Sequence, residues 1–192
     1  MQKATKLSHV FILIVFVACL VWAHTQDISQ YEKLKDPQIR KMPDKVKMLV
    51  VEKKGDPNVV AGMAFSTLFS TFFEQPGVKM APPRARWLNA PADPRNEWMG
   101  LYALPLPESV ETLRSQVEGV KIDYWDYGEV AEILHIGAYS EETPTIEKLF
   151  AFIAEQGYEI AGPHEEEYLR GPESGTDTSK YMTIIRYQVR RK

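Results

Sequence analysis

The chain contains six short runs rich in β-branched and aromatic residues, and two longer stretches in which apolar residues recur with helical spacing. The first pattern predicts β-strands and the second predicts helices. Each helical stretch lies between one predicted strand and a following pair, so the order strand, helix, strand, strand occurs twice. The predicted strands are Val46–Lys53, Arg84–Leu88, Trp98–Leu104, Glu129–Ile136, His164–Leu169 and Tyr181–Val189.

The two helical stretches differ in how much of their surface is apolar. From Ile146 to Ile153 the apolar residues form a single stripe, Thr143 is suited to the N-cap position, and Pro144 is suited to the first helical position. The earlier stretch, from Val59 to Phe73, is apolar over most of its surface. We therefore expect one amphipathic helix and one helix that is nearly buried.

The chain also repeats itself. The segment AFSTLFSTFFEQPGVKMAPPRARWLNAP (residues 64–91) aligns with TIEKLFAFIAEQGYEIAGPHEEEYLRGP (residues 145–172), and Trp87 aligns with Tyr168. Two similar halves, about 37–107 and 108–192, follow from this repeat. The predicted fold class is α+β, with two strand-helix-strand-strand modules related by a pseudo-two-fold axis, both helices on one face of an antiparallel sheet, and a cleft between the halves.

The N-terminus has the pattern of a targeting segment. Two lysines precede a continuous apolar run from Val10 to Ala23, and a polar stretch follows. We predict a signal peptide or an N-terminal membrane anchor over residues 1–23, a polar tether over 24–36, and a ligand-binding domain over 37–192. Lipid modification at Cys19 is a third alternative. Each of these alternatives predicts an exported protein, periplasmic or otherwise extracytoplasmic, that meets the membrane only through this segment.

Composition and charge exclude several kinds of chemistry. The whole chain has 23 basic and 26 acidic residues, and residues 1–23 remove two lysines, so residues 24–192 carry a net charge of −5. An acidic balance argues against nucleic acid as a partner. Cys19 is the only cysteine, which excludes disulfides and thiolate metal sites beyond it. No phosphate loop, HExxH motif or nucleophile elbow occurs, so we predict no metal and no cofactor. The oligomeric state is left open.

The segment PHEEEYL, residues 163–169, concentrates acidic residues on a predicted strand. Alternation places His164, Glu166 and Tyr168 on one face, and Glu165 and Glu167 on the other. The charges on such a strand suit a solvated edge that deters aggregation. Alternatively, Glu166 faces a cleft, where a buried carboxylate needs a cation or a hydrogen-bond donor. Glu165 and Glu167 would then be solvated or paired with arginine.

Aromatic residues offer a wall around such a carboxylate. Trp98 and Tyr102 share a strand face with Gly100 between them, where another group can approach the backbone closely. Core packing and a wall for a cationic ligand are both consistent with these rings. An ion pair between Arg86 and a glutamate of the second half is a competing role for the acidic run.

The chain from about Pro37 to Val189 resembles the GyrI-like small-molecule-binding domain, most specifically in its second half. That domain is related to effector domains of multidrug-responsive activators and more distantly to SOUL haem-binding proteins. The residues that carry the resemblance are Gly137 and Tyr139 before the helix, and the GPHEEEY stretch from Gly162 to Tyr168 after it. It implies two modules around a ligand cleft with Glu166 at its floor, meeting cationic or electrophilic ligands. Some stand-alone members resemble hydrolases of reactive cyclopropane-containing compounds, in which Glu166 would act with the hydroxyl of Tyr168 or Tyr139.

We therefore predict an exported or membrane-anchored domain that binds a small cationic or electrophilic organic molecule. One alternative is a hydrolase in which Glu166 is base or nucleophile and a tyrosine is the acid. Another is a structural or interaction domain with an occluded cleft. Haem held by His135 and His164 is a further alternative that no motif supports. The candidate ligand-binding residues are Glu166, Tyr168, Trp87, Trp98, Tyr102, Tyr139 and His135, with Glu166 and Tyr168 catalytic if the protein is an enzyme.

Overall fold

The structure is a computed structural model that describes residues 28–89, 93–172 and 177–192. The predicted targeting segment, residues 1–23, and the first four residues of the predicted tether lie outside the described residues. Within the described ranges, no helix has the length and apolar character needed to cross a membrane.

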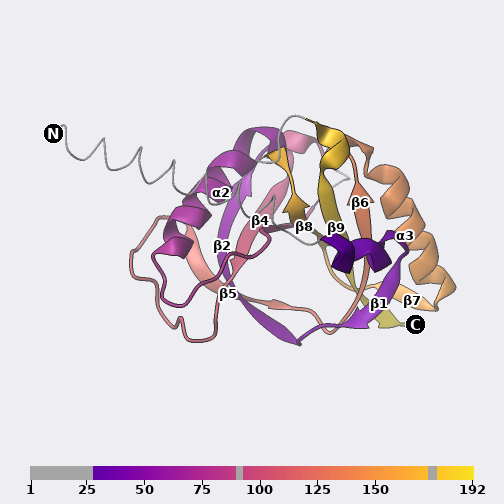
Figure 1. The fold of residues 1–192 in the computed structure, drawn as a ribbon, viewed down its shortest axis with the longest axis horizontal. Coiled ribbons are helices and arrows are strands. Elements are labelled where there is room, and N and C mark those ends of the chain that lie inside the picture. Colours follow the sequence, from indigo (N-terminus) through magenta and orange to yellow (C-terminus); the bar gives the residue numbers. More distant parts are fainter. Residues whose placement is uncertain (1–27, 90–92, 173–176) are drawn as a thin grey trace.

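The described chain forms nine strands and two α-helices, joined by short 3₁₀ turns (Figure 1). All six predicted strands and both predicted helices are present, with ends that differ by at most three residues. The elements are η1 (Ile28–Lys35), β1 (Gln38–Lys41), β2 (Lys45–Lys54), α2 (Pro57–Phe73), β3 (Arg84–Trp87), η2 (Arg95–Glu97), β4 (Met99–Pro105), β5 (Val120–Asp126), β6 (Glu129–Ile136), η3 (Tyr139–Glu141), α3 (Thr143–Glu155), β7 (Tyr158–Ile160), β8 (His164–Arg170), η5 (Thr178–Lys180) and β9 (Met182–Arg191).

The strands form one antiparallel sheet in the order β1-β6-β9-β8-β3-β4-β2-β5, and β7 pairs with β9. The order is symmetric about the β3–β8 pair, because β3, β4 and β2 of the first half mirror β8, β9 and β6 of the second. The halves also exchange their leading strands: β1 pairs with β6, and β5 pairs with β2. The predicted α+β fold with two repeated modules is confirmed.

Both helices cover the same face of the sheet. Leu68 of α2 packs over Ala85 of β3, and Leu149 of α3 packs over Ile185 of β9. Glu166 of β8 lies directly opposite Ala85 on one side and opposite Ile185 on the other. Since residues directly opposite in adjacent antiparallel strands share a face, Glu166 lies between the two helix-covered halves of the core.

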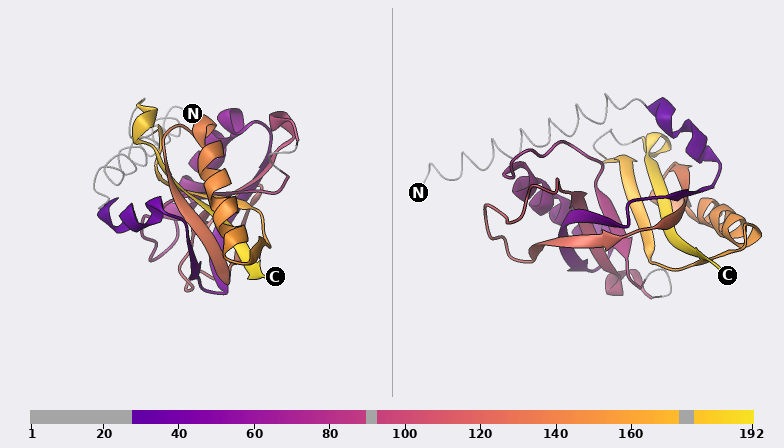
Figure 2. Two further views of the ribbon diagram at one scale, coloured as in Figure 1. Left: turned by 90° about the vertical axis from the view of Figure 1, so that its right-hand side faces the viewer. Right: turned by 90° about the horizontal axis from the view of Figure 1, so that it is seen from below.

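The other face of the sheet carries η1, on the side away from α3 (Figure 2). Leu34 of η1 is buried against Leu134, Leu169 and Ile184 of the second half. Part of the segment predicted to be a polar tether is thus a 3₁₀ helix that belongs to the folded unit, because one leucine in it completes an apolar cluster. The burial of Leu34 was not predicted, because the residues around it in the sequence are polar.

Two details of the helices also differ from expectation. α2 is not nearly buried: Val59 and Met63 near its start are 73% and 70% exposed, because only the side that carries Leu68 and Phe72 meets the sheet. α3 begins at Thr143, so the residue before it, Glu142, occupies the N-cap position that was predicted for Thr143.

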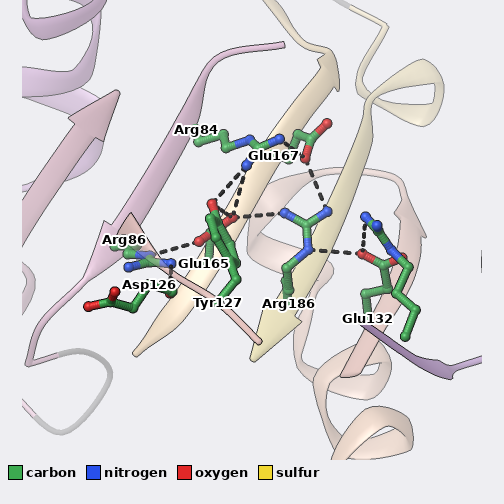
Figure 3. Close-up of polar contacts among 9 residues, drawn as sticks. Arg84, Arg86, Asp126, Tyr127, Glu132, Glu165, Glu167 and Arg186 are labelled. Atoms are coloured by element: carbon green, nitrogen blue, oxygen red, sulfur yellow. Dashed lines mark hydrogen bonds and ion pairs between the residues drawn. The ribbon is translucent and has the colours of Figure 1, made fainter. Parts of the chain in front are cut away.

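A buried group of arginines and glutamates joins the two halves on the face opposite the helices (Figure 3). In the sheet, Arg84 lies opposite Glu167 and Arg86 lies opposite Glu165, and each pair forms an ion pair at 3.1 Å and 2.7 Å. Burial acts to raise the pKa of Glu165, but the neighbouring guanidinium groups outweigh burial and hold that pKa below its usual value. The expectation that Glu165 and Glu167 are solvated is wrong, and pairing with arginine is confirmed.

Candidate functional site

Strand β8 presents three polar side chains toward the face that carries the helices. His164, Glu166 and Tyr168 alternate with the arginine-paired glutamates, as a strand period of two requires. The β8–β9 register shifts between Tyr168 and Arg170, which marks a β-bulge directly after the last of the three. Bulges of this kind re-aim side chains and are frequent beside functional sites.

The carboxylate of Glu166 accepts hydrogen bonds from three neighbours. Trp87 Nε1 lies 3.0 Å and His164 Nε2 2.9 Å from Oε1, and the Tyr168 hydroxyl lies 2.5 Å from Oε2. The Glu166 side chain is 12% exposed. Within the described chain, Glu166 forms no ion pair with lysine or arginine, and its hydrogen-bond partners are an indole, an imidazole and a phenol.

These contacts keep Glu166 ionised. Burial acts to raise its pKa, but the hydrogen bonds from His164, Tyr168 and Trp87 favour the charged form and hold the pKa below its usual value. Burial and the charge of Glu166 raise the pKa of the Tyr168 hydroxyl well above its usual value, so that phenol stays protonated. The pair is therefore a carboxylate beside a neutral phenol at neutral pH.

Aromatic rings lie around the pair. Trp87 contacts Tyr102 and Trp98 with ring centroids 5.7 Å and 5.6 Å apart, and Tyr168 contacts Tyr139 at 5.7 Å. Phe65 of α2, which the sequence did not single out, lies 5.7 Å from Tyr168. Tyr139 is 36% exposed, so the ring wall reaches the surface there.

The group that approaches the backbone closely at Gly100 is a side chain of the protein, Trp87. A Cβ atom at Gly100 would lie 2.7 Å from Cζ3 of Trp87, because the indole ring lies directly over this glycine. The small residue in β4 therefore makes room for the tryptophan that hydrogen-bonds to Glu166.

His135 does not join this group. Its ring nitrogens lie 2.9 Å from Thr145 Oγ1 and 3.1 Å from the carbonyl oxygen of Ala138, so it ties the loop before α3 to β6. His164 instead contacts both Glu166 and, through Nδ1 at 2.6 Å, the hydroxyl of Tyr187. Its position on the Glu166 face follows from strand alternation, although haem was the only ligand predicted for it.

Glu142 is a further member that sequence reasoning missed. Its carboxyl group is remote in sequence, yet one donor atom each from Glu142, His164 and Glu166 lie within 4.8 Å of one another. Three side chains at this spacing can in principle share an ion. We assign no metal to them, because the 2.9 Å hydrogen bond between His164 Nε2 and Glu166 Oε1 already joins two of the three donor atoms.

The fold and this carboxylate-centred site define a class of duplicated α+β small-molecule-binding domains, and comparison with known proteins agrees. The family model of the GyrI-like small molecule binding domain matches residues 35–190. The chain belongs to this family.

Solved structures share the fold at low sequence identity. A hydrolase from Listeria innocua is 20% identical with a TM-score of 0.70, covering 85% of this chain and 98% of that one. An uncharacterized conserved protein from Listeria innocua is 21% identical with a TM-score of 0.69 and the same coverage. The C-terminal domain of EcmrR is 12% identical with a TM-score of 0.66, covering 82% of this chain and 98% of that one. No curated protein matches.

Proposed function

We propose that the group around Glu166 binds a small organic ligand that is cationic or electrophilic. One observation carries the proposal: Glu166 is a nearly buried carboxylate whose hydrogen-bond partners are Trp87, His164 and Tyr168. The three donors hold the carboxylate in its charged form, and within the described chain no lysine or arginine pairs with it, so a ligand that supplies positive charge can form an ion pair largely shielded from water.

The surrounding rings favour the same ligand class. Phe65, Tyr139 and Trp98 lie in ring contact with Tyr168 or Trp87, which are hydrogen-bonded to the carboxylate. Aromatic faces attract cations. They also keep water away from a bound cation, which strengthens its electrostatic attraction to the carboxylate. An aromatic or lipophilic cation fits both features.

Binding should depend on the charge of Glu166. We expect benzyltrimethylammonium and related aryl quaternary ammonium ions to bind, and their neutral tert-alkyl isosteres to bind more weakly. Replacing Glu166 by glutamine keeps the shape and removes the charge, so affinity for the cations should fall by roughly 10- to 100-fold while affinity for the neutral compounds changes little. Isothermal titration calorimetry measures both.

The exposed residue Glu141, four positions before Thr145, supplies the matched control, because Glu141→Gln removes one carboxylate outside the site. Circular dichroism and thermal unfolding verify that the Glu166→Gln variant is folded. Equal affinity of the folded variant and the wild type for the cations would exclude the proposed role of Glu166.

Hydrolysis of an electrophilic ligand is a second candidate. The Tyr168 hydroxyl lies 2.5 Å from Glu166 Oε2, which places a neutral proton donor beside a carboxylate. A protein of the same fold is a hydrolase from Listeria innocua. In this reaction Glu166 takes a proton from water, the water oxygen bonds to the electrophilic carbon as a strained ring opens, and the phenol protonates the group that leaves that carbon.

The reaction is tested with a spirocyclopropyl dienone, a strained-ring electrophile. Wild-type protein should convert it to the ring-opened hydrated product, detected by mass spectrometry, and both Glu166→Gln and Tyr168→Phe should lower the rate at least 100-fold. If the wild type and both variants convert the compound only at the uncatalysed rate, the hydrolase function is excluded and the binding function remains.

We also propose that the domain acts outside the cytoplasm, on the strength of the apolar segment from Val10 to Ala23. A membrane contact limited to that segment and the absence of a nucleic-acid partner belong to the same proposal. Fractionation of cells that express the whole chain tests the location, and the mass of the mature protein distinguishes cleavage after residue 23 from a retained anchor or a lipid at Cys19.

A further inference from the structure

Glu142 is a buried carboxyl group that the helix-covered face holds beside Glu166. It lies between η3 and α3, is 7% exposed, and brings one carboxyl oxygen within 4.8 Å of donor atoms of both His164 and Glu166. Its Oε1 is buried without a hydrogen-bond partner in the part of the chain that the structure describes. A buried polar atom of this kind calls for an explanation, and a ligand group is one.

The groups near Glu142 on the neighbouring strands are a carboxylate, an imidazole and phenols, and the imidazole of His164 already contacts Glu166 at 2.9 Å. Glu166 and His164 of β8 each bring a donor atom within 4.8 Å of a Glu142 carboxyl oxygen, and the hydroxyl of Tyr187 in β9 lies 2.6 Å from His164 Nδ1. Among the described residues, no lysine or arginine forms an ion pair with Glu142. Two carboxyl groups this close in a dry environment favour the state in which only one of them is charged.

The charge is on Glu166, because that carboxylate receives three hydrogen bonds and Glu142 receives none at Oε1. In agreement, burial and the charge of Glu166 raise the pKa of Glu142 to about 9. Without a ligand, Glu166 is thus a carboxylate and Glu142 a neutral carboxylic acid at neutral pH.

We propose that Glu142 is a second ligand-contacting carboxyl group, and that a cationic ligand displaces its proton on binding. The proposal rests on the proposed function of Glu166. The proton passes to the buffer, Glu142 becomes a carboxylate, and the ligand cation then lies against two carboxylates in place of one. No covalent bond changes apart from the O–H bond of Glu142.

This arrangement narrows the ligand class. A compact cation, whose positive charge can reach both Glu142 and Glu166, or a dication is favoured over a cation whose charge is spread over a large ring system. The sign of the pH dependence follows. The complex releases a proton that the free protein holds up to a pH of about 9, so affinity rises with pH below that value, by at most about tenfold per pH unit.

Isothermal titration calorimetry with benzyltrimethylammonium tests the proposal. Titrations at one neutral pH in phosphate and in Tris, whose enthalpies of ionisation differ, give the number of protons released. We expect up to one proton for the wild type and for Glu141→Gln, and none for Glu142→Gln, whose affinity should also be independent of pH from about 6 to 8.

The outcomes separate this inference from the proposed function. Binding that depends on Glu166 but releases no proton, or releases the same number after Glu142→Gln, overturns the role of Glu142 alone. No binding of this cation or of other aryl quaternary ammonium ions to the wild type overturns both proposals. Stabilisation by Zn²⁺ alone that is lost in both Glu142→Gln and His164→Ala overturns the inference in favour of a metal site.

Discussion

Replacing Arg186 by methionine should lower the free energy of unfolding by about 3–5 kcal/mol, the range measured when one partner of a buried ion pair is removed. Arg186 is 1% exposed, and its guanidinium group donates to Glu132 at 2.9 Å, Glu165 at 2.8 Å and Glu167 at 3.1 Å (Figure 3). Methionine fills a similar volume but leaves these carboxylates buried with fewer cations. Urea unfolding at neutral pH measures the loss.

Arg190 provides a matched control on the same strand. It pairs with Glu159 at 2.6 Å, but its side chain is 70% exposed, so Arg190→Met should change stability by less than about 1 kcal/mol. Arg186→Lys, which keeps a charge but not the fork of donors, should fall between the two. A wild-type-like unfolding midpoint for Arg186→Met would show that the arginine cluster contributes no net stability.

Replacing Glu142 by glutamine should make the protein more stable at neutral and mildly alkaline pH. The pKa of Glu142 is raised to about 9 in the folded protein, whereas an unfolded glutamate titrates near its usual value of 4.5. Between these values the unfolded chain has lost a proton that the folded protein keeps, so wild-type stability falls as pH rises, by at most about 1.4 kcal/mol per pH unit. Glutamine mimics the protonated form and removes that slope.

The expected result is a stability difference between Glu142→Gln and the wild type that is near zero at pH 4 and grows to about 3 kcal/mol at pH 7. Urea unfolding at several pH values measures it. The exposed Glu141, which the structure places next to Glu142, serves as control, and Glu141→Gln should show no such trend. A constant difference across this pH range would mean that Glu142 is ionised in the folded protein.

The sequence determined the strands and their faces well, because local patterns carry that information. The period of two on β8 separated Glu166 from Glu165 and Glu167, and the repeat aligned Trp87 with Tyr168. The short strands β1, β5 and β7 were not predicted. β1 and β7 have only four and three residues, and β5, with seven, pairs with the other half at the edge of the sheet. Such strands lack a continuous buried face from which a pattern could be read.

The site was only partly predictable for a different reason. Glu166 and Tyr168 are close in sequence, and Trp87 was placed near them by the repeat. Glu142, just before α3, and Phe65, in the middle of α2, lie beside these residues because segments far apart in the chain pack together. No local signal encodes such contacts. The haem alternative likewise required two histidines to lie together, yet His135 of β6 hydrogen-bonds to Thr145 of α3 and to Ala138 in the loop that follows β6.

The antiparallel pair of β3 and β8, which forms the seam between the two halves, also favours association of each half with the other over association with a copy of itself. Equivalent positions of the repeat carry Arg84 and Arg86 in one copy and Glu165 and Glu167 in the other, so the antiparallel pair places cations opposite anions. A symmetric pairing of β8 with β8 from a second molecule would place Glu165 opposite Glu167 twice, and β3 with β3 would do the same with arginines. Like-charge contacts of this kind cost several kcal/mol. Divergence of the two copies therefore disfavours pairing of either module with a second copy of itself along this seam and favours pairing with its unlike counterpart.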